Sequence, residues 1–364
     1  MHKPRKILIS CGGTGGHVFP GIATGHVLQQ RGHAPELWLS GRRGVENETL
    51  RGWDGPVYRT GAQPLRPSTL PAFIATLWRV WRQMRRARPE VVLAMGCYAS
   101  VPPVLVARLL GIPVVLHEAN AVPGKAVTFL SRFARLTALS FASSAVYLPG
   151  RRTVCTGMPV RTALAGQPPL DGFTPDPPHA ADRRFTVLIT GGSLGAHAVN
   201  ELACEALLRL HHQGVRVRAI HQCGPQDEAG LRARYASAGV PVQVHAFLQE
   251  MGRAYASAEL AICRAGAATC FELCLCGVPS ILIPLPSAVR DHQRLNAEAM
   301  TAAGGALLRR QADLTPESLA AEIQALSTDH TRRAAMRQAL QTLAAPDAAE
   351  KLAELVLADT SIFR

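Results

Sequence analysis

A strand–turn–helix pattern occurs twice in this chain and restricts its fold more than any other feature. Lys6–His17 reads KILISCGGTGGH, and about half the chain later Thr186–His197 reads TVLITGGSLGAH. Each copy is an apolar run that enters a glycine-rich turn and then a helical pattern, which is typical of a strand leading into a helix. The repeat therefore predicts two similar α/β domains.

The rest of the chain alternates short apolar runs with longer helical patterns. Expected strands are Lys6–Ser10, Glu36–Ser40, Val91–Met95, Pro113–Glu118, Phe185–Thr190, Arg216–Gln222, Val242–Phe247, Leu260–Cys263 and Ser280–Leu285. Strands separated by helices form parallel sheets through right-handed crossovers. We expect two Rossmann-like domains joined by a proline-rich linker, with ligands bound at the carboxyl ends of the strands in a cleft between the domains.

Composition restricts the partners and the compartment. The 364 residues suffice for two domains, and the net charge of +13 predicts an anionic partner: nucleic acid, a phospholipid surface or a phosphorylated substrate. Nine scattered cysteines indicate free thiols in a reducing compartment, and the cluster Cys270, Cys274 and Cys276 lacks the spacing of a zinc site. No apolar run is long enough for a signal peptide or a membrane span, so we expect a cytoplasmic protein.

The glycine turns favour phosphate binding. Glycine permits positive φ and close approach of a ligand to backbone amides, and the following helix adds a partial positive charge. Neither turn fits G-x-G-x-x-G, and the chain has no G-x-x-x-x-G-K-[ST], which argues against a nicotinamide enzyme and a P-loop NTPase. For either turn alone, a tight connection without a ligand remains the alternative.

A third stretch, Cys263–Pro279, has two interpretations. Small residues follow Arg264 and precede Thr269 and Glu272 at the start of a predicted helix. A diphosphate could reach this helix N-terminus, and Glu272 could accept hydrogen bonds from both hydroxyls of a ribose. Alternatively, Thr269-x-x-Glu272 is a capping box, and the spacing does not decide between these.

Seven motifs follow one another along the chain: GGTGGHVFPGIA, GCYAS, PVVLHEANAVPGKA, GMPVR, GGSLGAHAVN, CRAGAATCFE and DHQRLNA. They occur in the order seen in the MurG family, which this chain resembles over nearly its whole length. Members move N-acetylglucosamine from UDP-N-acetylglucosamine to the muramyl C4 hydroxyl of lipid I, giving lipid II in peptidoglycan synthesis. The resemblance implies the GT-B fold. It implies an acceptor and membrane-side domain at 1–160, a linker at 161–184, a UDP-sugar domain at 185–343, and a helix at 344–364 that crosses back to the first domain.

The resemblance also implies roles for individual residues. Donor-binding residues would be Thr14, Gly15, Gly16, Asn120, Arg161, Ser193, Leu248, Ala267, Ala268, Thr269, Glu272 and Gln293. Glu272 would bind the ribose, the Leu248 backbone would meet the uracil, and Gln293 would reach the sugar hydroxyls. The alternatives are an interdomain ion pair for Arg161 and a loop cap for Asn120.

His17 is the candidate catalytic residue. An inverting displacement requires the acceptor hydroxyl to lose a proton, and an imidazole, with an unperturbed pKa of about 6.5, suits that task. The alternative role is a hydrogen bond that fixes the turn. No two aspartates are separated by one residue, so we expect a helix N-terminus and arginine to stabilise the leaving UDP, with no metal and no cofactor.

Residues 70–89 form the strongest amphipathic segment. At helical spacing, one face carries Phe73, Leu77, Val80, Trp81 and Met84, and Arg79, Arg82 and Arg86 lie opposite; Ala62–Pro89 has six arginines and no carboxylate. We expect Phe73, Leu77, Trp78, Trp81, Arg79, Arg82 and Arg86 to dock on the anionic inner membrane, which would place a peripheral protein at its cytoplasmic face. The alternative is a core-packed helix with a solvated basic face. Nucleic acid is not an expected partner, because no stacking-aromatic motif is present.

Four positions depart from the family pattern. Leu194, Ala119, Met158 and Cys97 stand where the family has glutamine, glutamine, asparagine and glycine. Leu194 and Ala119 each remove a polar contact near the expected cleft, which concerns affinity or sugar preference more than reaction class. The open alternatives are another GT-B transferase acting on a diacylglycerol or a different polyprenyl lipid, a nicotinamide-dependent oxidoreductase, and a non-catalytic UDP-sugar-binding protein.

Overall fold

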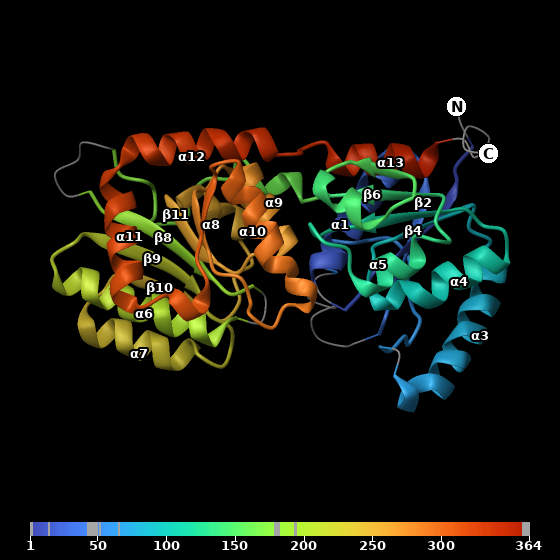
Figure 1. Cartoon of the computed structure of the whole chain (residues 1–364), viewed down its shortest axis with the longest axis horizontal. Helices are drawn as coiled ribbons and strands as arrows, with labels where there is room; N and C mark the ends of the chain where they lie inside the picture. The colour runs from blue at the N-terminus through green and yellow to red at the C-terminus, as the bar shows by residue number, and fades with distance from the viewer. Residues whose placement is uncertain are drawn as a thin grey trace. The chain divides into compact units, whose positions relative to one another are not determined.

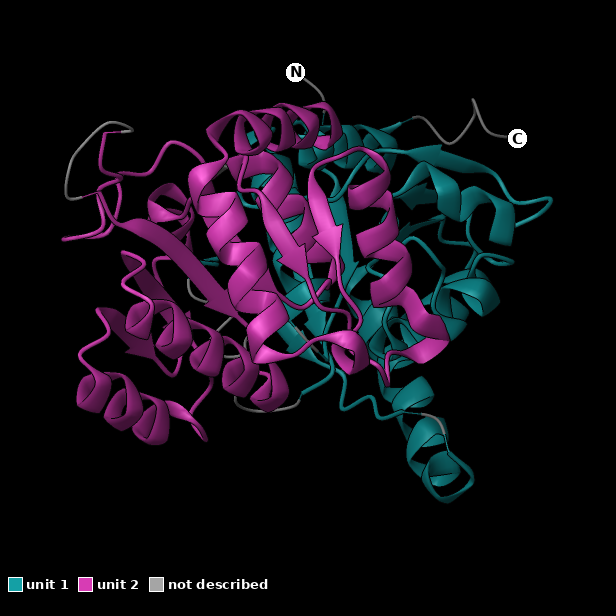
Figure 2. Ribbon diagram, turned by 60° about the vertical axis from the view of Figure 1, so that its left-hand side comes forward, with its two compact units in different colours: residues 1–161, 345–364 teal, residues 162–344 magenta. Residues whose placement is uncertain are grey.

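The structure is a computed structural model that describes residues 3–13, 15–41, 50, 52–64, 66–177, 183–192 and 195–358. The chain forms two compact units, 1–161 with 345–364 and 162–344, drawn in two colours in Figure 2. Each unit contains a parallel sheet with helices on both faces (Figure 1), which confirms the α/β prediction.

The sheet of the first unit has seven strands among the described residues. In spatial order they are β3 (Val57–Arg59), β2 (Ala34–Leu39), β1 (Lys6–Ser10), β4 (Val91–Ala94), β5 (Val114–Glu118), β6 (Leu136–Leu139) and β7 (Thr153–Cys155). The helices are α1 (Gly15–Gln30), α3 (Leu70–Ala87), α4 (Val101–Leu109), α5 (Lys125–Leu130) and α13 (Ala348–Leu357), with short 3-10 helices at Pro67–Thr69, Tyr98–Ser100 and Ala142–Tyr147.

The second unit repeats this arrangement with six strands among its described residues. In spatial order they are β10 (Val242–His245), β9 (Val217–Gln222), β8 (Phe185–Thr190), β11 (Leu260–Cys263), β12 (Ser280–Leu282) and β13 (Ala306–Leu308). The helices are α6 (His197–His212), α7 (Glu228–Ala238), α8 (Met251–Ser257), α9 (Ala267–Cys276), α10 (His292–Ala302), α11 (Pro316–Thr328) and α12 (His330–Leu343), with 3-10 helices at Thr162–Leu164, Val289–Asp291 and Gln311–Asp313.

The two sheets share one topology. In each, the first strand lies centrally, the next two extend to one side and the fourth pairs on the other, with every pair parallel: Ile7 is opposite Pro35 and Val91, and Val187 is opposite Ala219 and Leu260. Successive strands are therefore added on one side of the sheet before this point and on the other side after it, and the change lies between β1 and β4 in the first sheet and between β8 and β11 in the second. Ligands of open α/β sheets bind at this point, beyond the carboxyl ends of the strands.

Both faces of the first sheet are buried, as parallel sheets require. Ile7 and Ile9 of β1 pack in a cluster with Leu352 and Val356 of α13, whereas Leu8 points to the opposite face. The C-terminal helix α13 lies against α1 (Figure 1), and the Leu357 carbonyl accepts a hydrogen bond from Arg5 Nη1 at 2.8 Å. The last helix is thus part of the core of the first unit.

Four strands were missed by the sequence analysis: β3, β6, β7 and β13. Three of them have three residues and β6 has four. Runs this short show no measurable alternation, and they form strands because a parallel neighbour offers them hydrogen-bonding partners. The expected strand at Ser280–Leu285 ends earlier, at Leu282.

Part of the expected linker packs on the second unit. Leu170 and Phe173 are buried in its core, and Arg218 donates to the carbonyls of Gly172 and Thr174 at 2.9 and 2.6 Å. Because Arg218 itself is buried in β9, it fixes this segment to the sheet. No helix of the described residues is long and apolar enough to cross a bilayer.

Candidate functional site

The predicted site residues of the first unit follow β1 and β5. Gly15, Gly16 and His17 begin α1 directly after the β1 turn, and Asn120 follows β5 by two residues. Thr14 lies outside the described residues. At the end of β4, Gly96 has a φ of +73°, and an added Cβ would lie 2.5 Å from the His117 carbonyl oxygen, so only glycine fits where these loops meet.

His17 is held by the neighbouring strand. Its Nδ1 lies 2.9 Å from the carbonyl oxygen of Met95, directly after β4. A carbonyl oxygen only accepts, so Nδ1 carries the hydrogen, and in the neutral ring the lone pair is on Nε2. The contact matches the structural role considered for His17, and it also selects the tautomer that a general base needs.

His117 and Glu118, at the end of β5, are buried ionisable residues. Burial, with a smaller effect of the His17 charge, lowers the pKa of His117 to about 3. Burial raises the pKa of Glu118 to about 7, although its carboxylate accepts from the backbone N–H groups of Asn120 and Gly124 and from Asn120 Nδ2. Glu118 therefore fixes the loop that carries Asn120 and orients the Asn120 amide.

Arg161 is positioned by an aromatic ring of the same unit. Its guanidinium carbon lies 4.4 Å from the centre of the Phe19 ring, and Phe19 is two residues after His17 in α1. This cation–π contact holds the guanidinium beside the helix that carries the candidate base. Among the described residues, Arg161 Nε is buried without a hydrogen-bond partner, a donor that a bound anion could use.

In the second unit, the turn after β8 has a backbone that requires glycine. Gly195 has a φ of +75°, and an added Cβ would lie 1.9 Å from the Cys223 carbonyl oxygen at the end of β9. Ser193 and Leu194, in the same turn, lie outside the described residues. The turn therefore packs closely against the neighbouring strand.

Helix α9 begins at the predicted diphosphate position. Ala267, Ala268 and Thr269 are its first three residues, and the first helical hydrogen bond runs from Cys270 N to Gly266 O at 3.0 Å. The amides of the first three residues thus precede the hydrogen-bonding ladder of the helix and can donate to a phosphate. The N-cap is Gly266, so the capping-box interpretation of Thr269 and Glu272 is wrong.

Glu272 lies in the second turn of α9 and is partly exposed. Its Oε2 accepts a hydrogen bond from the Tyr255 hydroxyl at 2.9 Å. A carboxylate in this position, one turn after the amides at the helix start, can accept hydrogen bonds from adjacent hydroxyl groups of a ligand held there.

Leu248 and Gln293 also follow strands of this sheet. Leu248 is buried three residues after β10, and Gln293 is the second residue of α10, in the connection after β12. Gln293 Oε1 accepts from Leu285 N at 2.9 Å, so its amide NH2 remains as the donor toward a ligand. Just before Gln293, Arg290 and Asp291 have positive φ values of 55° and 54°, a strained backbone of the kind found at ligand-binding turns.

Two family models match the chain. Residues 7–138 match the glycosyltransferase family 28 N-terminal domain, and residues 186–352 match the glycosyltransferase family 28 C-terminal domain. A UDP-N-acetylglucosamine–N-acetylmuramyl-(pentapeptide) pyrophosphoryl-undecaprenol N-acetylglucosamine transferase of Xanthomonas axonopodis pv. citri is 40% identical over 97% of this chain and 82% of the relative. A relative of the same name from Syntrophotalea carbinolica is 39% identical over 95% of this chain and 97% of the relative.

A solved structure agrees with these matches. The crystal structure of Acinetobacter baumannii MurG is similar with a TM-score of 0.77 at 33% identity, covering 97% of this chain and 99% of that chain. The chain belongs to the MurG family of glycosyltransferases. The similarity spans both units, so the resemblance deduced from the motifs is confirmed.

Three of the four departures from the MurG motifs are described, and all three side chains are buried. Met158 accepts a weak hydrogen bond from Ser140 Oγ through its sulfur at 3.4 Å. Cys97 lies 3.5 Å from Ser100 Oγ, and Ala119 is buried between Glu118 and Asn120. These three side chains therefore pack near the strand ends, and the Glu118–Asn120 contact is present beside Ala119.

Two residues at the MurG-type site were not singled out in the sequence analysis. Glu118 is within the quoted HEAN stretch, but a carboxylate after a strand does not show which N–H groups it will bind. Tyr255 lies on α8, seventeen positions before Glu272, and a tyrosine on an otherwise ordinary helix carries no sequence signal of its partner. Arg264, which was quoted without a role, donates to the carbonyls of Ile283 and Pro284 at 3.1 Å and so fixes the loop before α10.

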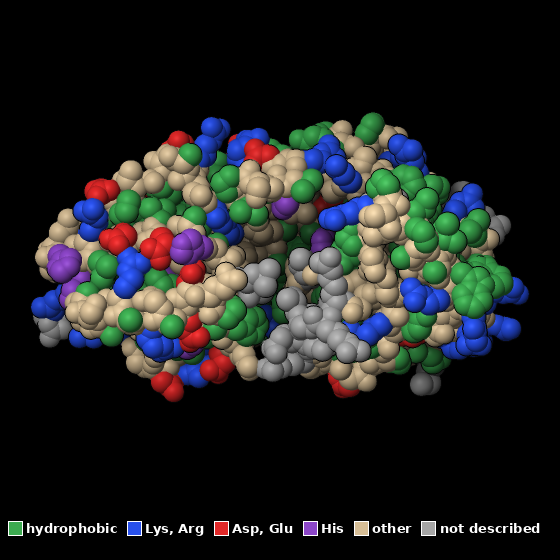
Figure 3. Space-filling model, turned by 90° about the horizontal axis from the view of Figure 1, so that it is seen from below, with side chains coloured by type: hydrophobic (Ala, Val, Ile, Leu, Met, Phe, Trp, Pro, Cys, Tyr) green, Lys and Arg blue, Asp and Glu red, His purple; other side chains and the backbone are tan. Residues whose placement is uncertain are grey.

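Helix α3 differs in part from the expected amphipathic pattern. Val80 and Met84 are buried and Phe73 and Leu77 are half-buried, but Trp81, expected on their face, is 37% exposed and Trp78 is 57% exposed. The guanidinium carbon of Arg82 lies 5.6 Å from the centre of the Trp78 ring, and that of Arg85 lies 5.0 Å from the centre of the Trp81 ring. On the first-unit side of Figure 3, apolar side chains lie among lysine and arginine side chains.

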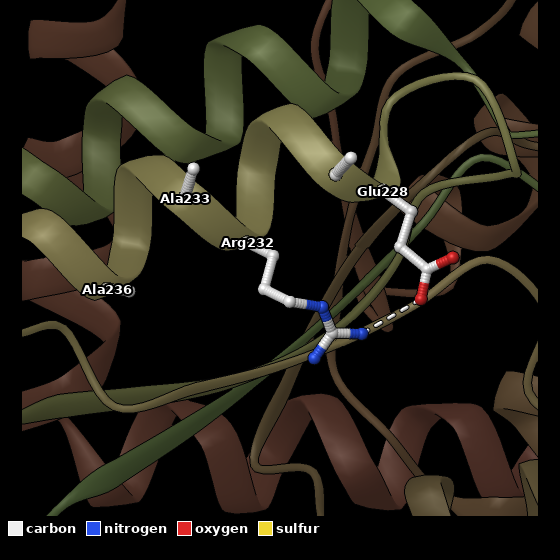
Figure 4. Close-up of a pocket in the computed structure, with 5 residues that line it drawn as sticks. Glu228, Arg232, Ala233 and Ala236 are labelled. Atoms are coloured by element: carbon white, nitrogen blue, oxygen red, sulfur yellow. Dashed lines mark hydrogen bonds and ion pairs between the residues drawn. The ribbon is translucent and has the colours of Figure 1, made fainter.

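Neither a metal-binding cluster nor the surface hollow on α7 adds a residue to this arrangement among the described parts of the chain. The described residues contain no group of three or more His, Cys, Asp or Glu placed to hold a metal ion, and all nine cysteines are free thiols. Figure 4 shows a hollow on the outer face of α7, where Arg232 donates to Glu228 at 2.8 Å. An exposed pair of this kind contributes about 0.3–0.5 kcal/mol to helix stability, and the hollow includes none of the predicted site residues.

Proposed function

We propose that this chain transfers N-acetylglucosamine from UDP-N-acetylglucosamine to the C4 hydroxyl of the muramyl sugar of lipid I, giving lipid II. The observation that carries the proposal is the similarity to a curated N-acetylmuramyl-(pentapeptide) pyrophosphoryl-undecaprenol N-acetylglucosamine transferase over 97% of the chain. The placement of the motif residues at the carboxyl ends of the strands, where α/β sheets bind ligands, supports it.

The second unit binds the UDP moiety in this proposal. The amides of Ala267, Ala268 and Thr269, with Ser193, bind the diphosphate, because they lie at a helix N-terminus whose dipole favours an anion. Glu272 accepts hydrogen bonds from the ribose hydroxyls, the Leu248 backbone meets the uracil, and Gln293 donates to the sugar.

The first unit removes the proton of the acceptor. The C4 oxygen attacks the anomeric carbon, its proton moves to His17 Nε2, and the bond between that carbon and the diphosphate oxygen breaks, which inverts the anomeric configuration. The Met95 carbonyl favours this assignment because it keeps the hydrogen on Nδ1. Thr14, Gly15, Gly16, Asn120 and Arg161 contact the donor sugar and diphosphate from this unit.

The UDP leaving group is stabilised by the α9 N-terminus and by Arg161 rather than by a metal or other cofactor. The chain has no D-x-D sequence of the kind with which many sugar transferases bind a divalent cation. Preorganised N–H donors and a guanidinium can stabilise the charge that develops on the diphosphate.

Helix α3 provides the membrane contact, and the protein is peripheral at the cytoplasmic face of the cell membrane. Exposed Trp78 and Trp81 beside Arg79, Arg82 and Arg86 have the composition of an interface between protein and anionic lipid. Phe73 and Leu77 contribute their exposed parts. This arrangement suits an acceptor whose diphosphate is linked to a polyprenyl chain in the bilayer.

The test is a turnover assay with UDP-N-acetylglucosamine and a soluble lipid I analogue, with a diacylglycerol as the comparison acceptor. We expect release of UDP with the lipid I analogue only. Turnover with diacylglycerol alone would indicate a different lipid glycosyltransferase. UDP-sugar binding without turnover on either acceptor would indicate a binding protein.

A further inference from the structure

A buried tyrosine contacts the carboxylate to which the ribose is assigned. Tyr255 is 2% exposed, and its hydroxyl donates to Glu272 Oε2 at 2.9 Å. The ring belongs to the same packed cluster as Leu248 and Cys270. Its position is therefore determined by the core, and the hydroxyl reaches Glu272 from a rigid support.

The direction of this hydrogen bond is fixed by chemistry. A carboxylate accepts only, so the phenol donates. Burial, together with the negative charge of Glu272, raises the pKa of Tyr255 well above its usual value of 10. The hydroxyl thus stays protonated, and remains a donor, throughout the physiological pH range.

Helix α8, which carries Tyr255, is anchored on its other side. Ser257 Oγ accepts from Leu170 N at 2.8 Å, and Arg253 Nη2 donates to Pro169 O at 3.0 Å. At Gly252 an added Cβ would lie 2.9 Å from Leu164 O, so the helix backbone packs directly on the preceding segment. The position of Tyr255 is consequently set by the 164–170 segment as well as by the packing of its own ring.

We propose that Tyr255 is a positioning residue for donor recognition, which holds the Glu272 carboxylate in the orientation that receives the ribose hydroxyls of a uridine diphosphate. This inference rests on the proposed function, because the role of Glu272 is itself proposed there. Without the hydroxyl, the Glu272 carboxylate loses one hydrogen bond that holds its rotamer, and restoring the binding rotamer reduces affinity for the nucleotide. The effect is on binding, since the reacting atoms do not contact Tyr255.

The experiment measures the dissociation constants of UDP and 2′-deoxy-UDP by titration calorimetry on the full chain. We expect Tyr255→Phe to weaken UDP binding roughly tenfold and 2′-deoxy-UDP binding less than about threefold, because the second nucleotide uses Glu272 less. The KM for UDP-N-acetylglucosamine should rise in parallel, with kcat within about twofold of wild type.

The matched control is Tyr235→Phe. Tyr235 is also 2% exposed in the second unit, and its hydroxyl lies 3.0 Å from His221 Nδ1, away from Glu272. This variant also loses one buried hydroxyl, so it reports how much any such loss reduces nucleotide binding through a general effect on the structure. Equal effects of the two substitutions on the preference for UDP over 2′-deoxy-UDP would overturn the inference.

Glu272→Gln separates the inference from the proposed function. If this variant binds both nucleotides as wild type does, Glu272 does not contact the ribose and the donor assignment fails. If it loses the preference for UDP while Tyr255→Phe keeps it, only the role of Tyr255 fails.

In the Glu272→Gln background, Tyr255→Phe should weaken UDP binding little further, and an additive loss would contradict positioning. Should Tyr255→Phe not fold, Tyr255→Met, whose flexible side chain fills irregular space, supports the same measurement with the same expected loss of preference.

Discussion

One oxygen of Glu118 accepts hydrogen bonds from both the backbone N and the side-chain Nδ2 of Asn120, at 2.8 and 3.2 Å. The other oxygen accepts from Gly124 N at 2.9 Å. A single buried carboxylate therefore closes the loop after β5 and sets the orientation of the asparagine amide.

Glu118→Gln should destabilise this loop. The new NH2 group would face at least one N–H donor, which leaves a buried polar group unsatisfied at a cost of about 1–3 kcal/mol. We expect a lower melting temperature and a kcat/KM reduced on the order of tenfold, measured by thermal unfolding and by turnover. Glu90→Gln, at an exposed carboxylate of the same unit, is the control. Wild-type stability and turnover in Glu118→Gln would contradict the role given to this residue.

His17→Ala should remove most turnover while leaving nucleotide binding intact. General-base catalysis contributes about 10²–10⁴-fold, so we expect kcat to fall within that range. The dissociation constant of UDP should change less than about twofold, because His17 is not assigned to the nucleotide. His26→Ala, in the same helix with a hydrogen bond to Gly52 O at 3.0 Å, is the control. Near-wild-type turnover of His17→Ala would show that the base lies elsewhere.

Charge reversal on α3 should reduce membrane binding. Each arginine near an anionic surface contributes about 1 kcal/mol, so replacing Arg79, Arg82 and Arg86 by glutamate should weaken binding to phosphatidylglycerol-containing vesicles by more than about 100-fold at low salt. Reversal of the exposed Arg184, Arg310 and Arg332 of the second unit changes the net charge equally. In a vesicle co-sedimentation assay, equal losses in the two triple variants would indicate an effect of net charge alone.

Acid should destabilise the second unit through His221. Burial lowers the pKa of His221 from 6.5 to about 3, so between these values the unfolded chain binds a proton that the folded chain does not. The contribution of His221 to the free energy of unfolding is fully present above about pH 6.5. Below that pH it falls by roughly 1.4 kcal/mol per pH unit. The free energy of unfolding is measured with denaturant from pH 7 to pH 4, and its slope against pH should be shallower for His221→Gln than for wild type. His212→Gln, at an exposed histidine of α6, should retain the wild-type slope. Identical slopes in all three proteins would refute this assignment.

Removal of divalent cations should leave the reaction unaffected. The diphosphate charge is assigned to the α9 amides and Arg161, so dialysis against a chelator is expected to keep kcat within about twofold. Turnover is measured before and after dialysis and again with added magnesium. Loss of activity that magnesium restores would require a cation in the mechanism.

The sequence predicted the architecture because the first strand of each sheet carries a strong local signal. β1 and β8 are continuous apolar runs followed by glycine turns, and this signal is local. β7 and β13 have three residues each, and their pairing depends on tertiary neighbours that no local pattern reports. The helix start at Gly266 was equally ambiguous: Thr269 and Glu272 have capping-box spacing, and only the backbone shows that the helix begins before Thr269.

His17, Asn120 and Glu272 were selected as candidates because a motif combines residue type with position, and their roles stay predictions. The contacts that surround them could not be predicted. Phe19 under Arg161 and Met95 beside His17 join residues more than seventy positions apart, and such contacts arise from strand order rather than from sequence spacing. On α3, periodicity identified the buried Val80 and Met84, but Trp81 lies at the edge of the apolar face, where small rotations decide exposure.

The attachment of α13 to the first unit affects how the protein is made. Its residues Leu352 and Val356 complete an apolar cluster that includes Ile7, so a segment synthesised early must wait for one synthesised much later. The second unit, by contrast, is uninterrupted from 162 to 344 and does not include α13. A chain truncated after residue 344 should therefore keep a complete second unit and expose apolar surface on the first, the species on which a chaperone would act.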